Sequence, residues 1–169
     1  MPFFMPGDLT MDAARIALGL GANLGQPEMT FHRAAELLRA AGMRDLRLAR
    51  CCRSAPVDCL PGIPDFTNSA AVGLWPGSPE ELLAVTQGIE QQLGRPPEHD
   101  RRDSRSIDID ILLFADRCVQ CPHLCIPHPR LRQRLFVLQP LAELAPDWLI
   151  PPEGISVAEA LAQLLNRES

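Results

Sequence analysis

The sequence predicts a single α+β domain in which a strand, a helix, two strands, a second helix and a fourth strand follow one another. Two observations predict this fold class. Short apolar runs end at glycines or prolines, as strands do, and two longer segments repeat apolar residues with the helical period. The length of 169 residues suits one domain. The element order is typical of the ferredoxin-like, βαββαβ arrangement, an antiparallel sheet with both helices packed on one face.

The first two predicted elements lie near the N-terminus. Residues 15–19 form a short apolar run that ends at a glycine, which favours a buried strand over a helix. Residues 28–41 carry apolar side chains at helical spacing, and Gly42 is placed as the residue after the C-cap. The apolar positions of this helix are Phe31, Ala34, Ala35 and Leu38.

Two strands and a helix are predicted in the middle of the chain. Residues 46–53 begin with an alternation of apolar and polar residues, which indicates a strand. Residues 68–75 are predicted to form a second strand, which stops at Pro76 and Gly77. A capping box follows, with Ser78 as N-cap, Pro79 at the first helical position and Glu81 at the third, and it predicts a helix that runs to Leu93. The apolar stripe of this helix, which leaves Gln87 and Glu90 one turn apart on a different face, is Leu82, Val85, Ile89 and Leu93.

The clearest strand of the chain covers residues 106–114. After it come a proline-rich stretch at 122–129, an apolar run at 135–141 and a last amphipathic helix at 157–165. We therefore expect extra elements at the C-terminus. Residues 1–13 are expected to form an N-terminal extension, and residues 14–169 the single domain.

Composition and charge narrow the function. All sixteen cationic side chains are arginine, and they stand against twenty-one Asp and Glu for a formal net charge of −5. The absence of lysine excludes a P-loop lysine and a Schiff-base lysine, and the absence of tyrosine removes phenol chemistry. An acidic balance argues against a protein that coats nucleic acid or anionic membrane, because such binding needs basic surface. It leaves room for a small anionic ligand in a locally basic cleft.

The compartment follows from what the N-terminus and the cysteines indicate. The first residues have no basic segment of the kind that opens a signal peptide, and no apolar run approaches the roughly 20 residues needed to span a bilayer. Six cysteines in such a chain are most simply reduced thiols. We expect a cytoplasmic monomer with small-molecule substrates and neither a nucleic-acid nor a membrane partner.

Two carboxylates carry the strongest functional signal. Alternation along a strand puts Asp108 and Asp110 on one face, about 6.6 Å apart along the strand. A half-solvated strand face would explain an isolated Asp-x-Asp, but Asp is a poor strand former and two like charges on one face repel. Divalent cations relieve that repulsion, and Mg²⁺ prefers oxygen ligands shared with substrate phosphates. The pair therefore predicts a magnesium site that serves phosphoryl transfer.

The arginines gather beside this pair. Residues 95–134 hold eight of the sixteen arginines and six acidic residues, a local balance of +2, while the rest of the chain carries −7. Arg95, Arg101, Arg102 and Arg105 lead directly into the strand, and guanidinium groups suit bidentate contact with phosphate oxygens. The alternative is a solvated loop with intermingled acids. Next to two strand aspartates we favour a phosphate-binding loop.

Three weaker patterns leave alternatives open. Residues 19–25 follow a strand and resemble a dinucleotide fingerprint, but the third glycine comes one residue late, so we interpret them as a tight strand-to-helix turn. Residues 118–128 contain three cysteines and two histidines, enough ligand types for zinc, yet no second pair stands at a distance. Cys51 and Cys52 are expected to be packing residues. Phe66 and Phe136 are core residues by default and could stack on a flat heterocycle at a site.

Together these motifs resemble the 6-hydroxymethyl-7,8-dihydropterin pyrophosphokinase family of the folate pathway. The resemblance runs from about Ile16 to Pro146, and its most specific element is the segment from Arg105 to Leu112 with its two strand aspartates. The other similar segments are 18–25, 54–57, 65–68, 87–95, 126–129 and 134–138.

The resemblance implies a reaction and a site. ATP would be the co-substrate, its terminal pyrophosphoryl group would pass to the hydroxymethyl oxygen of the pterin, and two Mg²⁺ ions would be bound by Asp108 and Asp110. Catalysis would rest on Arg95, Arg105, Asp108 and Asp110. The residues implied to bind ATP are Gln87, Glu90, Arg101, Arg105, Ile111, His128 and Arg134, and those implied to bind the pterin are Ser54, Val57, Phe66, Asn68 and Phe136.

Departures from the family pattern keep two further hypotheses open. Pro97 stands where a basic residue is common, residues 102–104 replace Trp-Gly-Pro, and His123 replaces a phosphate-binding arginine. Arg101 and Arg102 could substitute for the missing cations. The departures motivate a catalytically impaired relative as one alternative. A ferredoxin-like RNA-binding module is the other, and it would need aromatic residues on an exposed, basic sheet face.

Overall fold

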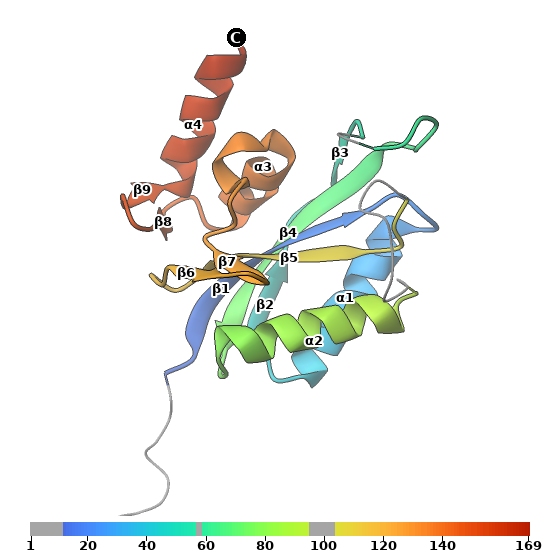
Figure 1. Cartoon of the computed structure of the whole chain (residues 1–169), viewed down its shortest axis with the longest axis horizontal. Helices are drawn as coiled ribbons and strands as arrows, with labels where there is room; N and C mark the ends of the chain where they lie inside the picture. The colour runs from blue at the N-terminus through green and yellow to red at the C-terminus, as the bar shows by residue number, and fades with distance from the viewer. Residues whose placement is uncertain (1–11, 57–58, 95–103) are drawn as a thin grey trace, which may run out of the picture.

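The computed structural model describes residues 12–56, 59–94 and 104–169 and has a mixed α/β architecture around an antiparallel sheet (Figure 1). The N-terminal extension expected at 1–13 lies almost wholly outside the described residues, and the first strand begins at Ala14. The elements that follow the predicted order are β1 (Ala14–Ala22), α1 (Pro27–Ala40), β2 (Arg44–Leu48), β3 (Cys52–Ser54), β4 (Phe66–Trp75), α2 (Pro79–Gln92) and β5 (Asp108–Phe114).

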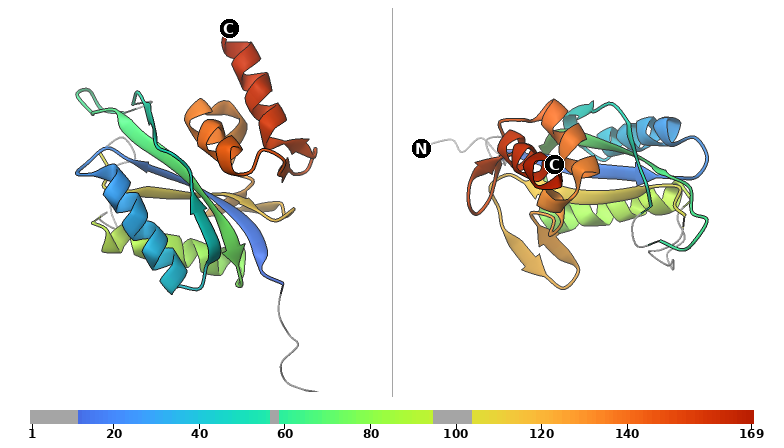
Figure 2. Two further views of the ribbon diagram at one scale, coloured as in Figure 1. Left: turned by 180° about the vertical axis from the view of Figure 1, so that it is seen from behind. Right: turned by 90° about the horizontal axis from the view of Figure 1, so that it is seen from above.

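The sheet has the strand order β2-β4-β1-β5, and β3 also pairs with β4. Neighbouring strands are antiparallel, with β1 between β4 and β5. Helices α1 and α2 cover one face, where Ile16, Leu18 and Leu20 of β1 pack against apolar residues of both helices (Figure 2). The expected antiparallel sheet with both helices on one face is therefore present.

The opposite face of the sheet is covered only in part, by elements that follow β5. These are the hairpin β6 (Val119–Cys121) and β7 (Leu124–Ile126), a 3-10 helix (Leu131–Gln133), α3 (Leu135–Leu144), the pair β8 (Leu149–Ile150) and β9 (Ile155–Ser156), and α4 (Val157–Glu168). Ala17, Ala70, Val72 and Leu113 of the sheet share a second core with α3 and α4 (Figure 2). The apolar run at 135–141 is thus a helix whose buried side packs against the sheet.

Two expected elements differ in detail from the structure. Residues 46–53 form not one strand but two, because Ala49 leaves the extended run: its N–H donates to Ala70 O (2.9 Å), and its carbonyl accepts from Ser69 Oγ (2.8 Å). The interpretation of residues 19–25 as a tight turn is wrong for their first half. β1 continues to Ala22, and Gly25, at φ +64°, makes the turn.

The helix ends are close to those predicted. Ala41 is the C-cap of α1, and Gly42 follows it at φ +116°, where an L side chain is strained. At α2, Ser78 Oγ accepts the Glu81 N–H (3.1 Å), which is half of the predicted capping box. The full reciprocal pair forms at α4, between Ser156 and Glu159.

Cys51 and Cys52 fit their expected packing role. Both are half-buried, and Cys51 packs against the core under α1 and α2. Burial, together with the nearby Glu28 carboxylate, raises the pKa of the Cys51 thiol to about 11, and burial also raises the pKa of Cys52. Both thiols are therefore protonated at neutral pH.

In the described parts of the chain, no helix is both long and apolar enough to cross a bilayer.

Gly88 offers a test of how α2 is stabilised. It lies in the helix interior, and a Cβ placed there would meet no atom within 4 Å. We expect Gly88→Ala to raise the free energy of unfolding by about 0.5–1 kcal/mol, since glycine loses more backbone entropy on folding. Urea denaturation measures the change. Gly42→Ala is the matched control: because of its positive φ it should destabilise, and equal gains at both sites would contradict the conformational argument.

Candidate active site

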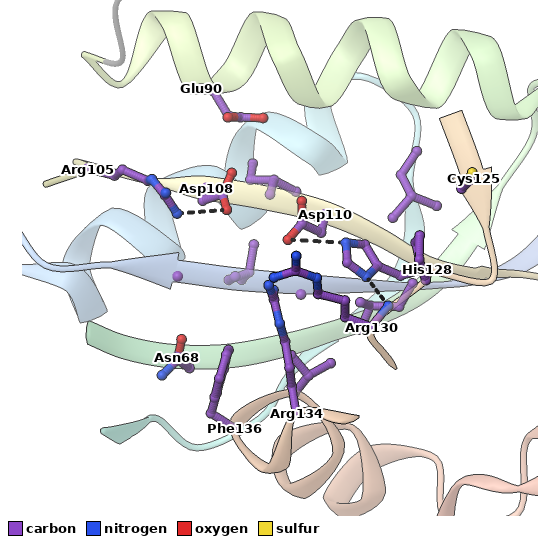
Figure 3. Close-up of a pocket in the computed structure, with 18 of the residues that line it drawn as sticks. Asn68, Glu90, Arg105, Asp108, Asp110, Cys125, His128, Arg130, Arg134 and Phe136 are labelled. Atoms are coloured by element: carbon purple, nitrogen blue, oxygen red, sulfur yellow. Dashed lines mark hydrogen bonds and ion pairs between the residues drawn. The ribbon is translucent and has the colours of Figure 1, made fainter. Parts of the chain in front are cut away.

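A large cleft opens where the C-terminal layer leaves the sheet uncovered. Its volume is about 1010 Å³, at the upper end of ordinary ligand pockets. The three strands β4, β1 and β5 form its floor, α2 lies beyond the edge strand β5, and the hairpin β6–β7 and the start of α3 form the other walls (Figure 3). The cleft therefore collects side chains from segments far apart in the sequence.

Two glycines of the central strand create the floor. Gly21 lies opposite Asn68 on β4 and Asp108 on β5, while Gly19 lies opposite Ala70 and Asp110. Because neighbouring strands are about 4.8 Å apart, Asn68 and Asp108 stand roughly 10 Å from each other across a strand that has no side chain between them. The result is a trough with an amide on one wall and two carboxylates on the other.

The two carboxylates share one face of β5, as alternation predicts, and each has a cationic or titratable neighbour. Arg105 Nη1 lies 3.5 Å from Asp108 Oδ2, and His128 Nε2 lies 4.0 Å from Asp110 Oδ2 (Figure 3). Asp110 is the more open of the two, at 39% side-chain exposure against 25%. Both oxygens can therefore reach a ligand in the cleft while their charge is partly balanced.

Asn23, just after β1, holds Arg105 in place. Its side-chain oxygen accepts the Arg105 N–H (2.7 Å), and its own N–H donates to the Arg105 carbonyl (3.0 Å). Its Nδ2 also donates to Pro64 O (3.2 Å) and Ser104 Oγ (3.3 Å). One side chain thus joins the loops before α1, β4 and β5. Sequence reasoning treated Asn23 only as part of a turn.

Arg105 has unused hydrogen-bonding capacity. Its Nε and the Ser106 hydroxyl are buried without a hydrogen-bond partner among the residues that the structure describes. The guanidinium also lies over the Phe66 ring, 5.6 Å from the ring centre. A buried donor without a hydrogen-bond partner costs free energy. An anionic ligand that accepts a hydrogen bond from this group removes that cost, and its binding is stabilised accordingly.

His128 is held as a neutral imidazole with a defined tautomer. Its Nδ1 accepts the Arg130 N–H (3.2 Å), so the proton of the neutral ring sits on Nε2, which faces Asp110. Burial lowers the pKa of His128, and the Arg134 guanidinium lowers it further. The ring therefore presents an N–H donor to the cleft.

Arg134 and Phe136 enter the cleft from the start of α3. Arg134 is the N-cap residue, and its guanidinium lies over the Phe136 ring, 5.6 Å from the ring centre. Burial lowers the pKa of Arg134, and the neighbouring Arg130 contributes to the same shift. Across the trough, Asn68 is 5% exposed and donates from Nδ2 to Ser54 Oγ (2.8 Å). This bond fixes the orientation of the amide.

The structure brings together every described residue that the sequence singled out for the site, although this placement does not test their roles. Val57, Arg95 and Arg101 lie outside the described residues, and the residues around Pro97 do so too. Arg130 also lines the cleft and was missed, although it belongs to the arginine-rich window. The predicted residues that line the cleft are Ser54, Phe66, Asn68, Gln87, Glu90, Arg105, Asp108, Asp110, Ile111, His128, Arg134 and Phe136.

The cysteine-rich hairpin does not form a zinc site in the structure. Cys118, Cys121 and Cys125 are exposed free thiols, and Cys121 and Cys125 line the cleft. Within the described ranges, no group of three or more His, Cys, Asp or Glu side chains is arranged to hold a metal ion. Two carboxylates alone still suit Mg²⁺, which takes its other ligands from water and substrate phosphates.

The fold and the cleft define an enzyme site for a polyanionic ligand next to a flat ring. Residues 17–146 match the family model described as 7,8-dihydro-6-hydroxymethylpterin-pyrophosphokinase, and the chain belongs to this family. A curated 2-amino-4-hydroxy-6-hydroxymethyldihydropteridine pyrophosphokinase of Methylorubrum extorquens is 40% identical over 89% of this chain and 93% of the relative. One of the same name from Synechocystis is 34% identical, covering 94% and 80%.

Solved structures share the fold at low identity. A Plasmodium falciparum HPPK-DHPS crystal structure has a TM-score of 0.73 at 14% identity and matches 95% of this chain. The chain spans only 47% of that protein and 22% of the Pneumocystis carinii folic acid synthesis protein, to which it is 29% identical. These longer proteins contain a region like this one and further sequence besides.

Gly21→Val tests whether the bare floor is needed. A Cβ at this position already lies 3.4 Å from Asn68 Oδ1, so the two methyl groups of valine would fill the trough. We expect pyrophosphokinase turnover to fall roughly 10- to 100-fold, because substrate would be displaced by about 1 Å. A steady-state assay and a thermal melt measure activity and folding. Wild-type turnover in the folded variant would contradict the role of the floor, and Gly88→Ala is the control.

Proposed function

We propose that this chain transfers the terminal pyrophosphoryl group of ATP to the hydroxymethyl oxygen of 6-hydroxymethyl-7,8-dihydropterin, a step of tetrahydrofolate biosynthesis. The new bond joins that oxygen to the β-phosphorus, the bond from the β-phosphorus to the α–β bridging oxygen breaks, the hydroxyl proton is released, and AMP leaves. The observation that carries the proposal is the cleft itself: in a chain of this family, it sets Asp108 and Asp110 opposite Asn68 and beside Arg105, His128 and Arg134.

The carboxylates are the proposed magnesium ligands. Asp108 and Asp110 offer hard oxygen donors on one strand face, next to guanidinium groups that suit phosphate oxygens, so the donor set fits two Mg²⁺ ions shared with ATP. When bound, Mg²⁺ would neutralise charge on the transferring group. Asp108 and Asp110 would hold the ions, and Arg105 and His128, which lie beside these carboxylates, would then be available to phosphate.

ATP is proposed to lie along β5 and α2. Arg105, His128 and Arg134 provide donors for phosphate oxygens, with Arg95 and Arg101 assigned to the same ligand by sequence resemblance alone. Gln87 and Glu90 face the cleft from α2; Glu90 is buried at 8% exposure, which suits hydrogen bonding to a heterocycle more than contact with solvent. Ile111 supplies apolar contact.

The pterin is proposed to lie between Phe66 and Phe136, with the Asn68 amide and the backbone of Ser54 and Val57 as hydrogen-bonding partners. Phe66, Asn68 and Ser54 are neighbours at one end of the trough: Ser54 and Phe66 pair across β3 and β4, and Asn68 donates to Ser54. Aromatic rings bind flat heterocycles by stacking.

No covalent intermediate is needed for this reaction. An alcohol nucleophile in phosphoryl transfer needs placement and charge neutralisation above all. The residues of the trough would orient the pterin hydroxymethyl group, and the arginines and His128 would hold the phosphates.

The order β2-β4-β1-β5 and the helices on one face support a ferredoxin-like classification. We also propose that residues 14–169 act as one domain in a cytoplasmic monomer.

The RNA-binding alternative gains no support from the second layer. The sheet face that such a module would leave open is covered over Ala70 and Val72 by α3 and α4, and its remaining part carries Asp108 and Asp110. Those carboxylates would repel a nucleic-acid backbone. The catalytically impaired alternative is decided by the assay that follows.

Asp110→Asn tests the reaction and its metal site together. We expect AMP formation from ATP to require both Mg²⁺ and the hydroxymethyl-dihydropterin in the wild type, and to fall at least about 100-fold in the variant. Asp116→Asn, at an exposed aspartate just past β5, is the matched control and should retain activity. An inactive, folded wild type would favour the impaired relative, and an active Asp110→Asn would refute the metal assignment.

Phe136→Ala separates the two substrates. We expect the pterin Kd to rise roughly 10- to 100-fold, because stacking on an aromatic ring contributes about 1–3 kcal/mol per base-like ring. The Kd of a non-transferable ATP analogue should stay close to that of the wild type. Calorimetric titration of each ligand measures both values. Equal weakening of both ligands, or none for the pterin, would contradict the assigned place of the pterin.

A further inference from the structure

Arg130 lies on a loop whose backbone is held firmly at the rim of the cleft. The His128 N–H donates to Leu112 O of β5 (3.0 Å), and the Leu131 N–H donates to His128 O (3.1 Å). Leu131 is 1% exposed and belongs to the core under α3 and α4. The Arg130 N–H itself donates to His128 Nδ1. Arg130 is therefore presented from a fixed position between two anchored residues.

The Arg130 side chain points into the cleft beside Arg134. Figure 3 shows the two labelled side chains converging from different elements toward the region of Asp110. Among the residues that the structure describes, no carboxylate forms an ion pair with Arg130. Arg132, two residues on, differs: it lies 3.7 Å from Glu153 Oε2 and donates to Gln163 Oε1 (3.3 Å), away from the cleft. The two arginines thus have different surroundings.

Two neighbouring guanidinium groups repel unless an anion lies between them. The Arg130 N–H donates to His128 Nδ1 (3.2 Å), and its guanidinium, after burial as the main cause, contributes to the lowered pKa of Arg134, so Arg130 lies close to both groups. Arg130, Arg134 and the Nε2–H of His128 thus form a patch of donors on the phosphate side of the cleft. A planar guanidinium pair matches the oxygens of a polyphosphate well.

We propose that Arg130 is a further ATP-binding residue, whose guanidinium contacts the triphosphate beside Arg134. This proposal rests on the proposed function, because it assumes that ATP occupies this cleft. The chain has no lysine, so apart from magnesium every permanent positive charge placed on ATP must come from an arginine side chain. Arg130 lines the same cleft as Arg105 and Arg134, and it supplies a further cation from the loop after β7.

Arg130→Ala tests the proposal, with Arg132→Ala as the matched control. Calorimetric titration of each protein with Mg²⁺ and α,β-methylene-ATP, with AMP, and with the pterin gives three affinities. We expect Arg130→Ala to lower the affinity for the triphosphate analogue roughly 10- to 100-fold, because a charge-assisted hydrogen bond is lost. AMP and pterin affinities should stay at the wild-type level. Arg132→Ala should match the wild type for all three ligands.

The outcomes separate this inference from the proposed function. Wild-type affinity for the triphosphate analogue in Arg130→Ala would overturn the role of Arg130 while leaving the function intact. Weakening of all three ligands alike would also overturn it, because it would indicate a disturbed loop. A wild type that binds neither the analogue nor the pterin would overturn the proposed function, and this inference with it. If Arg130→Lys keeps the preference for the triphosphate analogue over AMP, and Arg130→Ala loses affinity for the analogue, the positive charge at position 130 is what binds the triphosphate.

Discussion

The site depends on a central strand that presents two glycines, and so no side chain, to the floor of the cleft. β1 lies between β4 and β5, and on the face opposite the helices α1 and α2 it presents Gly19 and Gly21 to the cleft, while Ala17 lies in the core under α3 and α4. On the other side, Ile16, Leu18 and Leu20 fill the core under the helices. One strand therefore anchors the fold through one face and opens the site through the other. The antiparallel register then fixes Asn68 and Asp108 on opposite sides of the same glycine.

The C-terminal layer completes the cleft because it covers only half of that sheet face. α3 and α4 pack over Ala17, Ala70 and Val72, and stop short of the glycines. The same helix that buries Leu138 and Leu141 in this core carries Phe136 and follows Arg134 at its start. Packing energy at one end of α3 thus fixes functional groups at its other end. The rigidity of a site built this way comes from the core beneath it.

Sequence patterns could predict those features of the fold that depend on residues close together in the sequence. The strand aspartates, the helix caps and the stripe of α2 all follow from residues near in sequence. The break between β2 and β3 does not, because it depends on bonds from Ala49 to Ala70 and Ser69, twenty residues away. The role of Asn23 as a clamp on Arg105 likewise joins loops 82 residues apart. Arg130 could be seen only once the loop after β7 was placed beside α3.

The distribution of charge explains how an acidic chain can hold a polyanion. The net charge of −5 belongs to the whole surface, whereas the cleft sets Arg105, Arg130 and Arg134 around two carboxylates. Those carboxylates stand close to Arg105 and His128, so neither sign dominates before a ligand arrives. A divalent cation on the carboxylates would shift the balance toward positive and free Arg105 and the His128 Nε2–H for phosphate. Metal and polyphosphate should therefore bind with positive coupling, since each removes the repulsion that the other would meet.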